Sequence, residues 1–115
     1  MMCPPTLLIR PTSDRVRESL FSILGGLCPE ARVLDLFAGV GTFGLEAISR
    51  GASHATFVEH SPVSLKFLRK NGLFCRDRLD VIPGDVIKVL TLLSKQQKRF
   101  DLIFLDPPYD VGWVE

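Results

Sequence analysis

Acidic residues recur along this chain at or near the ends of short apolar segments. They are Asp35, Glu59, Asp85 and Asp106, and their successive separations are 24, 26 and 21 positions (59−35, 85−59 and 106−85). Each interval fits one strand followed by one helix, and the carboxyl ends of parallel strands meet at one edge of a sheet. The spacing therefore predicts four carboxylates along one edge, beside a glycine turn at positions 39–41. Each of them, taken alone, equally fits a helix-capping or turn residue.

The charge of this edge favours one class of nucleotide-like ligand over another. A dinucleotide would place its pyrophosphate at the start of the first helix after the turn, where Asp35 and Asp106 would each repel it by about 1 kcal/mol or more. S-adenosylmethionine has no phosphate, and its sulfonium and ammonium groups suit a rim of carboxylates. Glu59 lies 18 positions after Gly41 (59−41) and fits the ribose hydroxyl groups of either ligand. We therefore expect S-adenosylmethionine, with a dinucleotide-binding oxidoreductase module as the alternative.

The string Asp106-Pro107-Pro108-Tyr109 carries the most specific chemistry in the chain. Two prolines fix φ and remove two backbone donors, so the Asp106 carboxylate and the Pro107 carbonyl would face a ligand as acceptors. Such acceptors suit an incoming amino group, because they would hold its two N–H bonds and leave its lone pair directed at a methyl sulfonium. The ring of Tyr109 would stack on the nucleobase that bears the amine. The alternative is a plain turn at the end of a strand.

Apolar and amphipathic segments alternate in the chain and must position these residues. Short apolar runs predict strands at positions 32–37, 55–58, 80–82 and 100–105. Apolar side chains at helical spacing predict helices over positions 14–24, 42–50, 62–71 and 86–95. Strands that alternate with single helices form right-handed crossovers in a parallel sheet, with helices on both faces. The predicted fold class is therefore α/β.

The composition is that of one ordinary globular domain spanning residues 1–115. The chain has 14 Lys and Arg against 13 Asp and Glu, and 46% of its residues are hydrophobic. A net charge of +1 gives no whole-chain signature of nucleic-acid or membrane binding. No apolar run approaches the ~18 residues of a membrane span, and the three cysteines lack the spacing of metal ligands. We therefore expect an intracellular, cytoplasmic protein with reduced cysteines and no membrane or metal partner.

Three strings together resemble the bacterial RsmD family of class I S-adenosylmethionine-dependent methyltransferases. They are Arg10-Pro-Thr-Ser-Asp-Arg-Val-Arg-Glu-Ser-Leu-Phe21, Asp35-Leu-Phe-Ala-Gly39 and Gly44-Leu-Glu-Ala-Ile-Ser-Arg-Gly-Ala52. Members of that family methylate N2 of a guanine in small-subunit ribosomal RNA. The resemblance implies a Rossmann-like fold with strand order 3-2-1-4, S-adenosylmethionine as cofactor, and ribosomal RNA or the small ribosomal subunit as partner.

The resemblance also implies roles for two sets of residues. The cofactor-binding set is Thr12, Asp35, Phe37, Gly39, Gly41, Glu59, Asp85 and Val86. The catalytic set, which would hold the target base, is Asp106, Pro107, Pro108 and Tyr109. Within the first set, Glu59 would hold the ribose, Asp85 and Val86 would meet the adenine, and the others would line the methionine end.

The chain departs from the family's pattern after Tyr109. It has six further residues (115−109), where the family's sheet continues through three more strands. We therefore expect an incomplete domain whose 100–105 strand lies at an edge and invites self-association. Two further alternatives stay open: an N6-adenine-type DNA or RNA methyltransferase, which shares the Asp-Pro-Pro-aromatic corner, and a non-catalytic cofactor-binding fragment. The basic residues between 66 and 78 are expected to form a solvated face.

Overall fold

Five parallel strands form one sheet. The computed structural model describes residues 7–9 and 26–105. The strand order is β1-β5-β2-β3-β4, with β1 at Leu7–Ile9, β2 at Arg32–Leu36, β3 at His54–Glu59, β4 at Leu79–Pro83 and β5 at Leu102–Leu105. The run β4-β3-β2-β5 is the predicted order 3-2-1-4, so the predicted α/β fold with a parallel sheet is confirmed.

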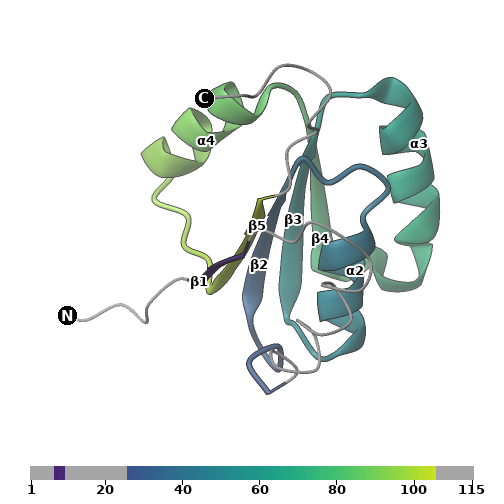
Figure 1. The fold of residues 1–115 in the computed structure, drawn as a ribbon, viewed down its shortest axis with the longest axis vertical. Coiled ribbons are helices and arrows are strands. Elements are labelled where there is room, and N and C mark those ends of the chain that lie inside the picture. The colour runs from purple at the N-terminus through teal and green to yellow at the C-terminus, as the bar shows by residue number, and fades with distance from the viewer. Residues whose placement is uncertain (1–6, 10–25, 106–115) are drawn as a thin grey trace.

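Helices cover both faces of the sheet (Figure 1). Helices α2 (Thr42–Ser49) and α3 (Pro62–Asn71) lie on one face, and α4 (Val86–Lys95) lies on the other. Successive residues of a strand point to opposite faces. Accordingly, Val33 of β2 packs in the core beneath α2 and α3, whereas its neighbour Leu34 packs in the core beneath α4.

The ends of two helices follow from the capping residues. Ser61 precedes α3, and its hydroxyl oxygen accepts a hydrogen bond from Ser64 N at 3.3 Å, with Pro62 in the first turn. Asp85 precedes α4, and its carboxylate accepts from Lys88 N at 3.2 Å. Both helices therefore begin where the sequence predicts. The short 3-10 helix η1 (Leu73–Arg78) between α3 and β4 was not predicted.

Strand β1 corrects the expectation that the 100–105 strand lies at an edge. β5 pairs with β2 on one side and with β1 on the other, where Leu8 is in register with Ile103. β1 therefore covers the side of β5 that was expected to be exposed. The expectation of self-association rested on that exposed edge, so its premise is wrong. Three residues after a proline-rich start are too few to show a strand periodicity, so the sequence offered no signal for β1.

Several predicted features lie outside the described residues. They are the helix over 14–24, Thr12, and the Asp106, Pro107, Pro108 and Tyr109 string. Within residues 7–9 and 26–105, no helix is long and apolar enough to cross a membrane. In the same residues, no group of three or more His, Cys, Asp or Glu side chains is arranged to hold a metal ion.

Candidate functional site

Glu59 connects two turns at the carboxyl edge of the sheet. It is the last residue of β3, and only 7% of its surface is exposed. Its Oε1 accepts from Gly39 N at 2.7 Å, and its Oε2 accepts from Ser61 N at 3.0 Å. One carboxylate therefore holds the turn after β2 against the start of α3.

The carboxylate of Glu59 retains capacity for a ligand. An ionised carboxylate offers about four lone-pair sites on its two oxygens, and the two backbone amides use one on each oxygen. The sites left over could accept hydrogen bonds from ribose hydroxyl groups. His60 lies beside it, with Nδ1 at 3.7 Å from Glu59 Oε2 and a side chain that is 71% exposed.

Asp35 is buried, whereas the spacing of the acidic residues predicted a carboxylate along the edge of the sheet. It lies inside β2 on the face covered by α2, and only 1% of its surface is exposed. Its Oδ2 accepts from Gly44 N at 3.0 Å, in the first turn of α2. This hydrogen bond fixes the position of α2 on the sheet, because breaking it would leave a buried acceptor without a donor and lower the stability of the fold. Its contact with the methionine end of a cofactor stays a prediction.

The turn between β2 and α2 reverses the chain by left-handed backbone conformations. Phe37, Gly39 and Gly41 have φ values of 59°, 58° and 91°. A positive φ is uncommon for a residue other than glycine and marks a constrained site at Phe37. No atom of the described residues lies within 4 Å of the place that a Cβ would take on Gly39, so the described chain leaves the outer side of the turn open. A ligand can therefore approach the backbone closely there.

The amides of this turn serve the protein itself. Gly39 N donates to Glu59, and Gly41 N donates to the carbonyl of Ala38 at 2.9 Å. The side-chain amide of Asn71 on α3 donates to the carbonyl of Val40 at 3.1 Å. Gly39 and Gly41 would therefore give a ligand space, because their amides already donate to protein acceptors.

Asp85 and Val86 follow the end of the neighbouring strand β4. Glu59 and Pro83 are in register, and Gly84 N donates to the carbonyl of Glu59 at 3.0 Å. The segment that starts α4 therefore lies next to Glu59. The carboxylate of Asp85 is exposed and caps α4, whereas the side chain of Val86 is buried in the core beneath that helix. The side chain of Val86 is thus committed to packing, which leaves its backbone to meet a ligand.

Sequence reasoning missed three contacts of the site. They are the amide of Ser61, the amide of Gly44 and the side chain of Asn71. The side chain of Ser61 caps α3, but the contact of its amide with Glu59 has no sequence pattern. Asn71 lies 31 positions from the carbonyl that it holds, so only the fold reveals the contact.

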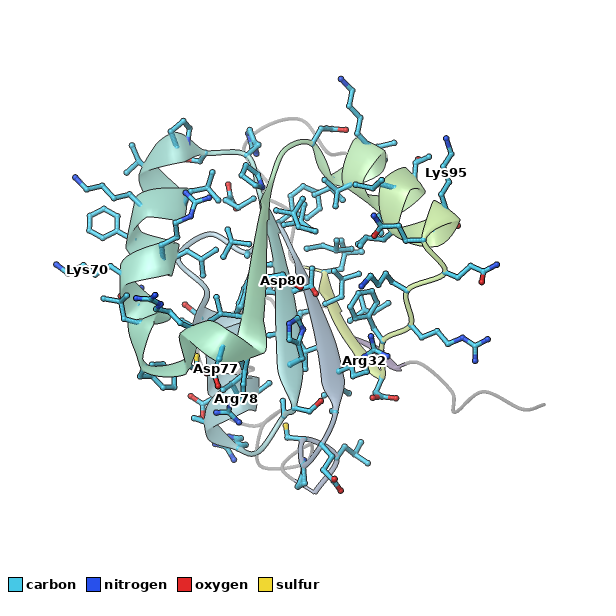
Figure 2. All side chains as sticks on the ribbon, turned by 180° about the vertical axis from the view of Figure 1, so that it is seen from behind. Arg32, Lys70, Asp77, Arg78, Asp80 and Lys95 are labelled. Carbon is cyan, nitrogen blue, oxygen red and sulfur yellow. The ribbon has the colours of Figure 1, made fainter. Side chains whose placement is uncertain are left out.

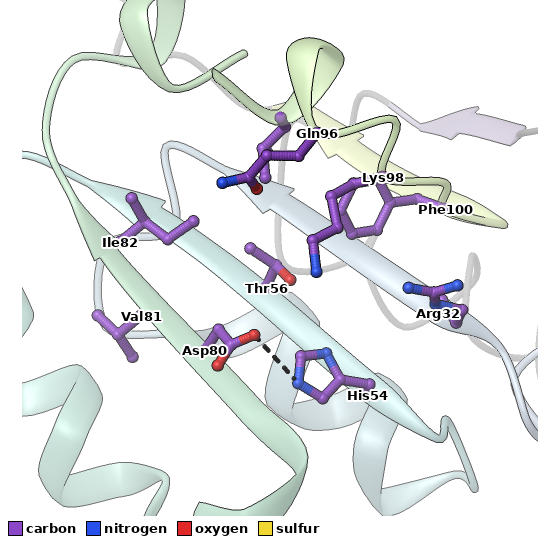
Figure 3. Close-up of a pocket in the computed structure, with 10 residues that line it drawn as sticks. Arg32, His54, Thr56, Asp80, Val81, Ile82, Gln96, Lys98 and Phe100 are labelled. Atoms are coloured by element: carbon purple, nitrogen blue, oxygen red, sulfur yellow. Dashed lines mark ion pairs between the residues drawn. The ribbon is translucent and has the colours of Figure 1, made fainter. Parts of the chain in front are cut away.

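A separate hollow of about 260 Å³ lies at the opposite end of the strands (Figure 3). Arg32 and His54, which begin β2 and β3, line it together with Asp80 of β4. His54 Nε2 and Asp80 Oδ2 are 3.4 Å apart. Because this hollow is at the amino end of the strands, it is not part of the site around Glu59.

The edge around Glu59 fits S-adenosylmethionine on two observations. The acidic side chains of Glu59 and Asp85 flank it, and the open side of Gly39 leaves room at the backbone. Two of the turn amides already donate to protein acceptors and are not free to bind a phosphate. S-adenosylmethionine has no phosphate and does not need them. In this arrangement Glu59 could hold hydroxyl groups, and Asp85 could accept from an amine.

Comparisons with known proteins agree with this fold. A model of the family described as Conserved hypothetical protein 95 matches residues 1–115. Ribosomal RNA small subunit methyltransferase D of Buchnera aphidicola subsp. Acyrthosiphon pisum is 39% identical over 110 residues, which cover 93% of this chain and 56% of that protein. The chain spans about half the length of the curated relatives it matches, between 53% and 56% of three of them.

Solved structures share the architecture. A hypothetical protein of Thermus thermophilus gives a TM-score of 0.74 at 32% identity, over 97% of this chain and 65% of that one. A SAM-dependent methyltransferase of Agrobacterium tumefaciens gives a TM-score of 0.69 at 22% identity, over 80% of this chain and 31% of that one. At 22% identity the second likeness concerns the fold alone. A putative methyltransferase of Escherichia coli, 36% identical with a TM-score of 0.75 over 91% of this chain and 57% of that one, shares this class I methyltransferase fold.

Proposed function

Since the chain belongs to the RsmD family, which its family model describes as Conserved hypothetical protein 95, we propose that it binds S-adenosylmethionine and serves methyl transfer to ribosomal RNA. The target in this proposal is the exocyclic N2 amine of a guanine in small-subunit RNA. The observation that carries the proposal is the buried carboxylate of Glu59, which joins the glycine turn to the start of α3.

The described residues would hold the cofactor in three places. Glu59 would accept from the ribose hydroxyl groups, and Asp85 with the backbone of Val86 would meet the adenine. The turn that contains Phe37, Gly39 and Gly41 would face the methionine end, above the buried carboxylate of Asp35. When bound, S-adenosylmethionine would supply a methyl group on a positively charged sulfur. No metal or covalent step is part of this proposal, because placement governs an in-line displacement.

The target base would be held by Asp106, Pro107, Pro108 and Tyr109. Support comes from the register of the sheet. Leu105 ends β5 and is paired with Leu36, the residue before the turn that begins at Phe37. Asp106 follows Leu105 in the chain, so the acceptor corner and the glycine turn start from neighbouring strand ends. An amine held there would be beside the methionine end of the cofactor.

Calorimetry with three ligands tests the cofactor. We expect S-adenosylmethionine and S-adenosylhomocysteine to bind more tightly than NAD, because the carboxylates of the rim would repel a pyrophosphate. Replacing Asp35 or Asp85 by alanine should weaken the binding of S-adenosylmethionine and S-adenosylhomocysteine more than the binding of NAD. Tighter binding of NAD would replace this proposal by a dinucleotide-binding module.

Methylation mapping tests the target. Small-subunit ribosomal RNA from cells with and without the intact gene should differ by one N2-methylguanine. An Asp106→Ala gene should leave methylation slower by about 10² to 10³, as for removal of one positioned hydrogen-bonding group in an active site, while S-adenosylhomocysteine still binds. Loss of an N6-methyladenine instead would identify the adenine alternative, and an unchanged rate in Asp106→Ala would refute the role of that residue.

A further inference from the structure

Basic and aromatic side chains gather on α3 and η1. Between positions 61 and 78 the chain has five Lys or Arg and one acidic residue, a net charge of +4 (5−1). The rest of the chain therefore carries −3, from nine basic and twelve acidic residues (14−5 and 13−1). We call the exposed basic and aromatic side chains of this segment the basic-aromatic face; they are Lys66, Phe67, Arg69, Lys70, Phe74 and Arg76.

The cations of this face have no structural partner in the described chain. Lys66, Arg69, Lys70 and Arg76 are exposed, and within residues 7–9 and 26–105 none of them forms an ion pair. Lys66 and Lys70 stand four positions apart on one helix, an arrangement of like charges that destabilises an isolated helix. A merely solvated face would gain from acidic residues at this spacing, and α3 contains none.

Two phenyl rings stand among these cations without being buried. Phe67 is 47% exposed and Phe74 is 66% exposed, while Leu65 and Leu68 supply the buried side of α3. Rings left in water contribute little to the core, and exposed apolar groups bordered by charge mark binding surfaces. Flat rings interleaved with cations are the combination that binds single-stranded nucleic acid, through base stacking and phosphate neutralisation.

We propose that the basic-aromatic face binds a single-stranded segment of RNA, with Lys66, Arg69, Lys70 and Arg76 on phosphates and with Phe67 and Phe74 stacked on bases. The choice of RNA as the polyanion rests on the proposed function. The face lies on the side of the sheet that carries α2 and α3, away from α4 (Figure 1). It is thus a contact surface additional to the corner after β5, and it would fix the orientation of a large RNA without touching the target base.

Salt titration of RNA binding tests the phosphate contacts. The probe is a fluorescein-labelled single-stranded RNA of about 12 nucleotides, within the usual site size. Each phosphate contact contributes about 0.7 to the slope of log K against log salt for single strands. The variant Lys66→Ala/Lys70→Ala should therefore lower the slope by about 1.4. Its matched control is Lys88→Ala/Lys95→Ala on α4, which removes the same charge from the other side of the molecule.

The control is well separated from the face. Figure 2 shows Lys70 pointing outward from α3 and Lys95 pointing outward from α4 on opposite sides of the sheet. If the control lowers the slope as much as the test variant, binding depends on net charge alone and the proposal is wrong. An unchanged slope in Lys66→Ala/Lys70→Ala overturns it equally.

Ring removal tests the stacking. Phe67→Ala and Phe74→Ala should each weaken RNA binding about tenfold with little change in the salt slope. The matched control is Leu92→Ala on α4, because Leu92 is 46% exposed and Phe67 is 47% exposed. Equal binding of duplex RNA, or tighter binding to phosphatidylserine-containing vesicles than to the RNA, would overturn single-stranded RNA as the occupant.

A ligand titration separates this inference from the proposed function. All variants of the face should bind S-adenosylhomocysteine as the parent chain does, since none of the altered residues is assigned to the cofactor. If the parent binds S-adenosylhomocysteine and RNA but the face variants bind RNA normally, RNA binding by the basic-aromatic face is refuted and the proposed function stands. If the parent does not bind S-adenosylhomocysteine, the function fails whatever the RNA measurement shows.

Discussion

The amide nitrogen of Gly39 lies 2.7 Å from Oε1 of Glu59, a contact that spans 20 positions of sequence. The other carboxylate oxygen accepts from Ser61 N, so the same side chain also holds the start of α3. A ligand at this edge would meet a carboxylate whose position is already fixed. Such prior ordering lowers the entropic cost of binding.

Glu59→Gln separates the charge of this side chain from its shape. The amide can accept from one backbone N–H, but its NH₂ group would then face the other donor. We expect the free energy of unfolding to fall by about 1–3 kcal/mol, because a buried donor loses its partner. S-adenosylhomocysteine should also bind more weakly. Urea denaturation and calorimetry measure the two effects.

The control for Glu59→Gln is Glu46→Gln on α2. Glu46 pairs with Arg50 at 2.8 Å, and both side chains are about 40% exposed. Loss of this surface ion pair should change stability by no more than about 1 kcal/mol. Equal effects of the two substitutions would contradict the assignment of a special role to Glu59.

Gly44→Ala should disturb the packing of α2 on the sheet. A Cβ at this position would come within 2.7 Å of Phe57 Cζ and 3.2 Å of Asp35 Oδ2. Since the ring of Phe57 is fully buried, it has little freedom to move, and we expect a loss of about 1–3 kcal/mol. Gly26→Ala is the control, because no other described residue lies within 4 Å of its Cβ position. Thermal denaturation that shows equal stability for the two variants would argue against close packing at Gly44.

Asp85 has a capping role and a proposed adenine role, and two substitutions distinguish them. Asparagine also caps helices well, so Asp85→Asn should keep the stability of the parent, whereas Asp85→Ala should lose about 1 kcal/mol. Both should bind S-adenosylhomocysteine more weakly if the carboxylate meets the cofactor. Parent-like affinity in Asp85→Asn, measured by calorimetry, would leave this residue with capping alone.

The buried cysteines should make stability fall in alkaline solution. Burial raises the pKa of the Cys28 and Cys75 thiols above the usual value of 9.0. In the unfolded chain they ionise at the lower pKa, so their contribution to stability is present below pH 9.0 and is lost as the pH rises through the folded-state pKa. Urea denaturation across this range should show a shallower pH dependence in Cys28→Ala/Cys75→Ala than in a Cys3→Ser parent.

Alkylation gives a second readout of the same burial. At about pH 8.5, in the Cys3→Ser parent, iodoacetamide should modify Cys28 and Cys75 only after denaturant is added, because thiolates are the reactive form. Rapid modification without denaturant would contradict the burial of both thiols.

Local features of the sequence were sufficient to predict α2, α3, α4 and most of the strands, but not the short helix η1. Ser61 and Asp85 begin helices because their side chains accept hydrogen bonds from amides only three residues away. The apolar run over positions 100–105 predicts a strand, and β5 forms there with a paired strand on each side. The expectation that it lies at an edge failed because the covering strand begins at Leu7, 95 positions away (102−7).

The sequence by itself determined the alternation of strands and helices and the placement of acidic residues one strand-helix unit apart, because spacing and capping act over a few residues. Tertiary structure alone decided what each acidic side chain does. Asp35 and Glu59 both stand near strand ends, yet the pleat points Asp35 beneath α2, where it holds Gly44, while Glu59 reaches across to Gly39. Both residues belong to the same face of the sheet, since Asp35 is in register with Phe57 and Glu59 follows Phe57 by two positions. Their different roles depend on the partners that the packing of α2 and the pairing of distant strands bring close, and no local pattern encodes these partners.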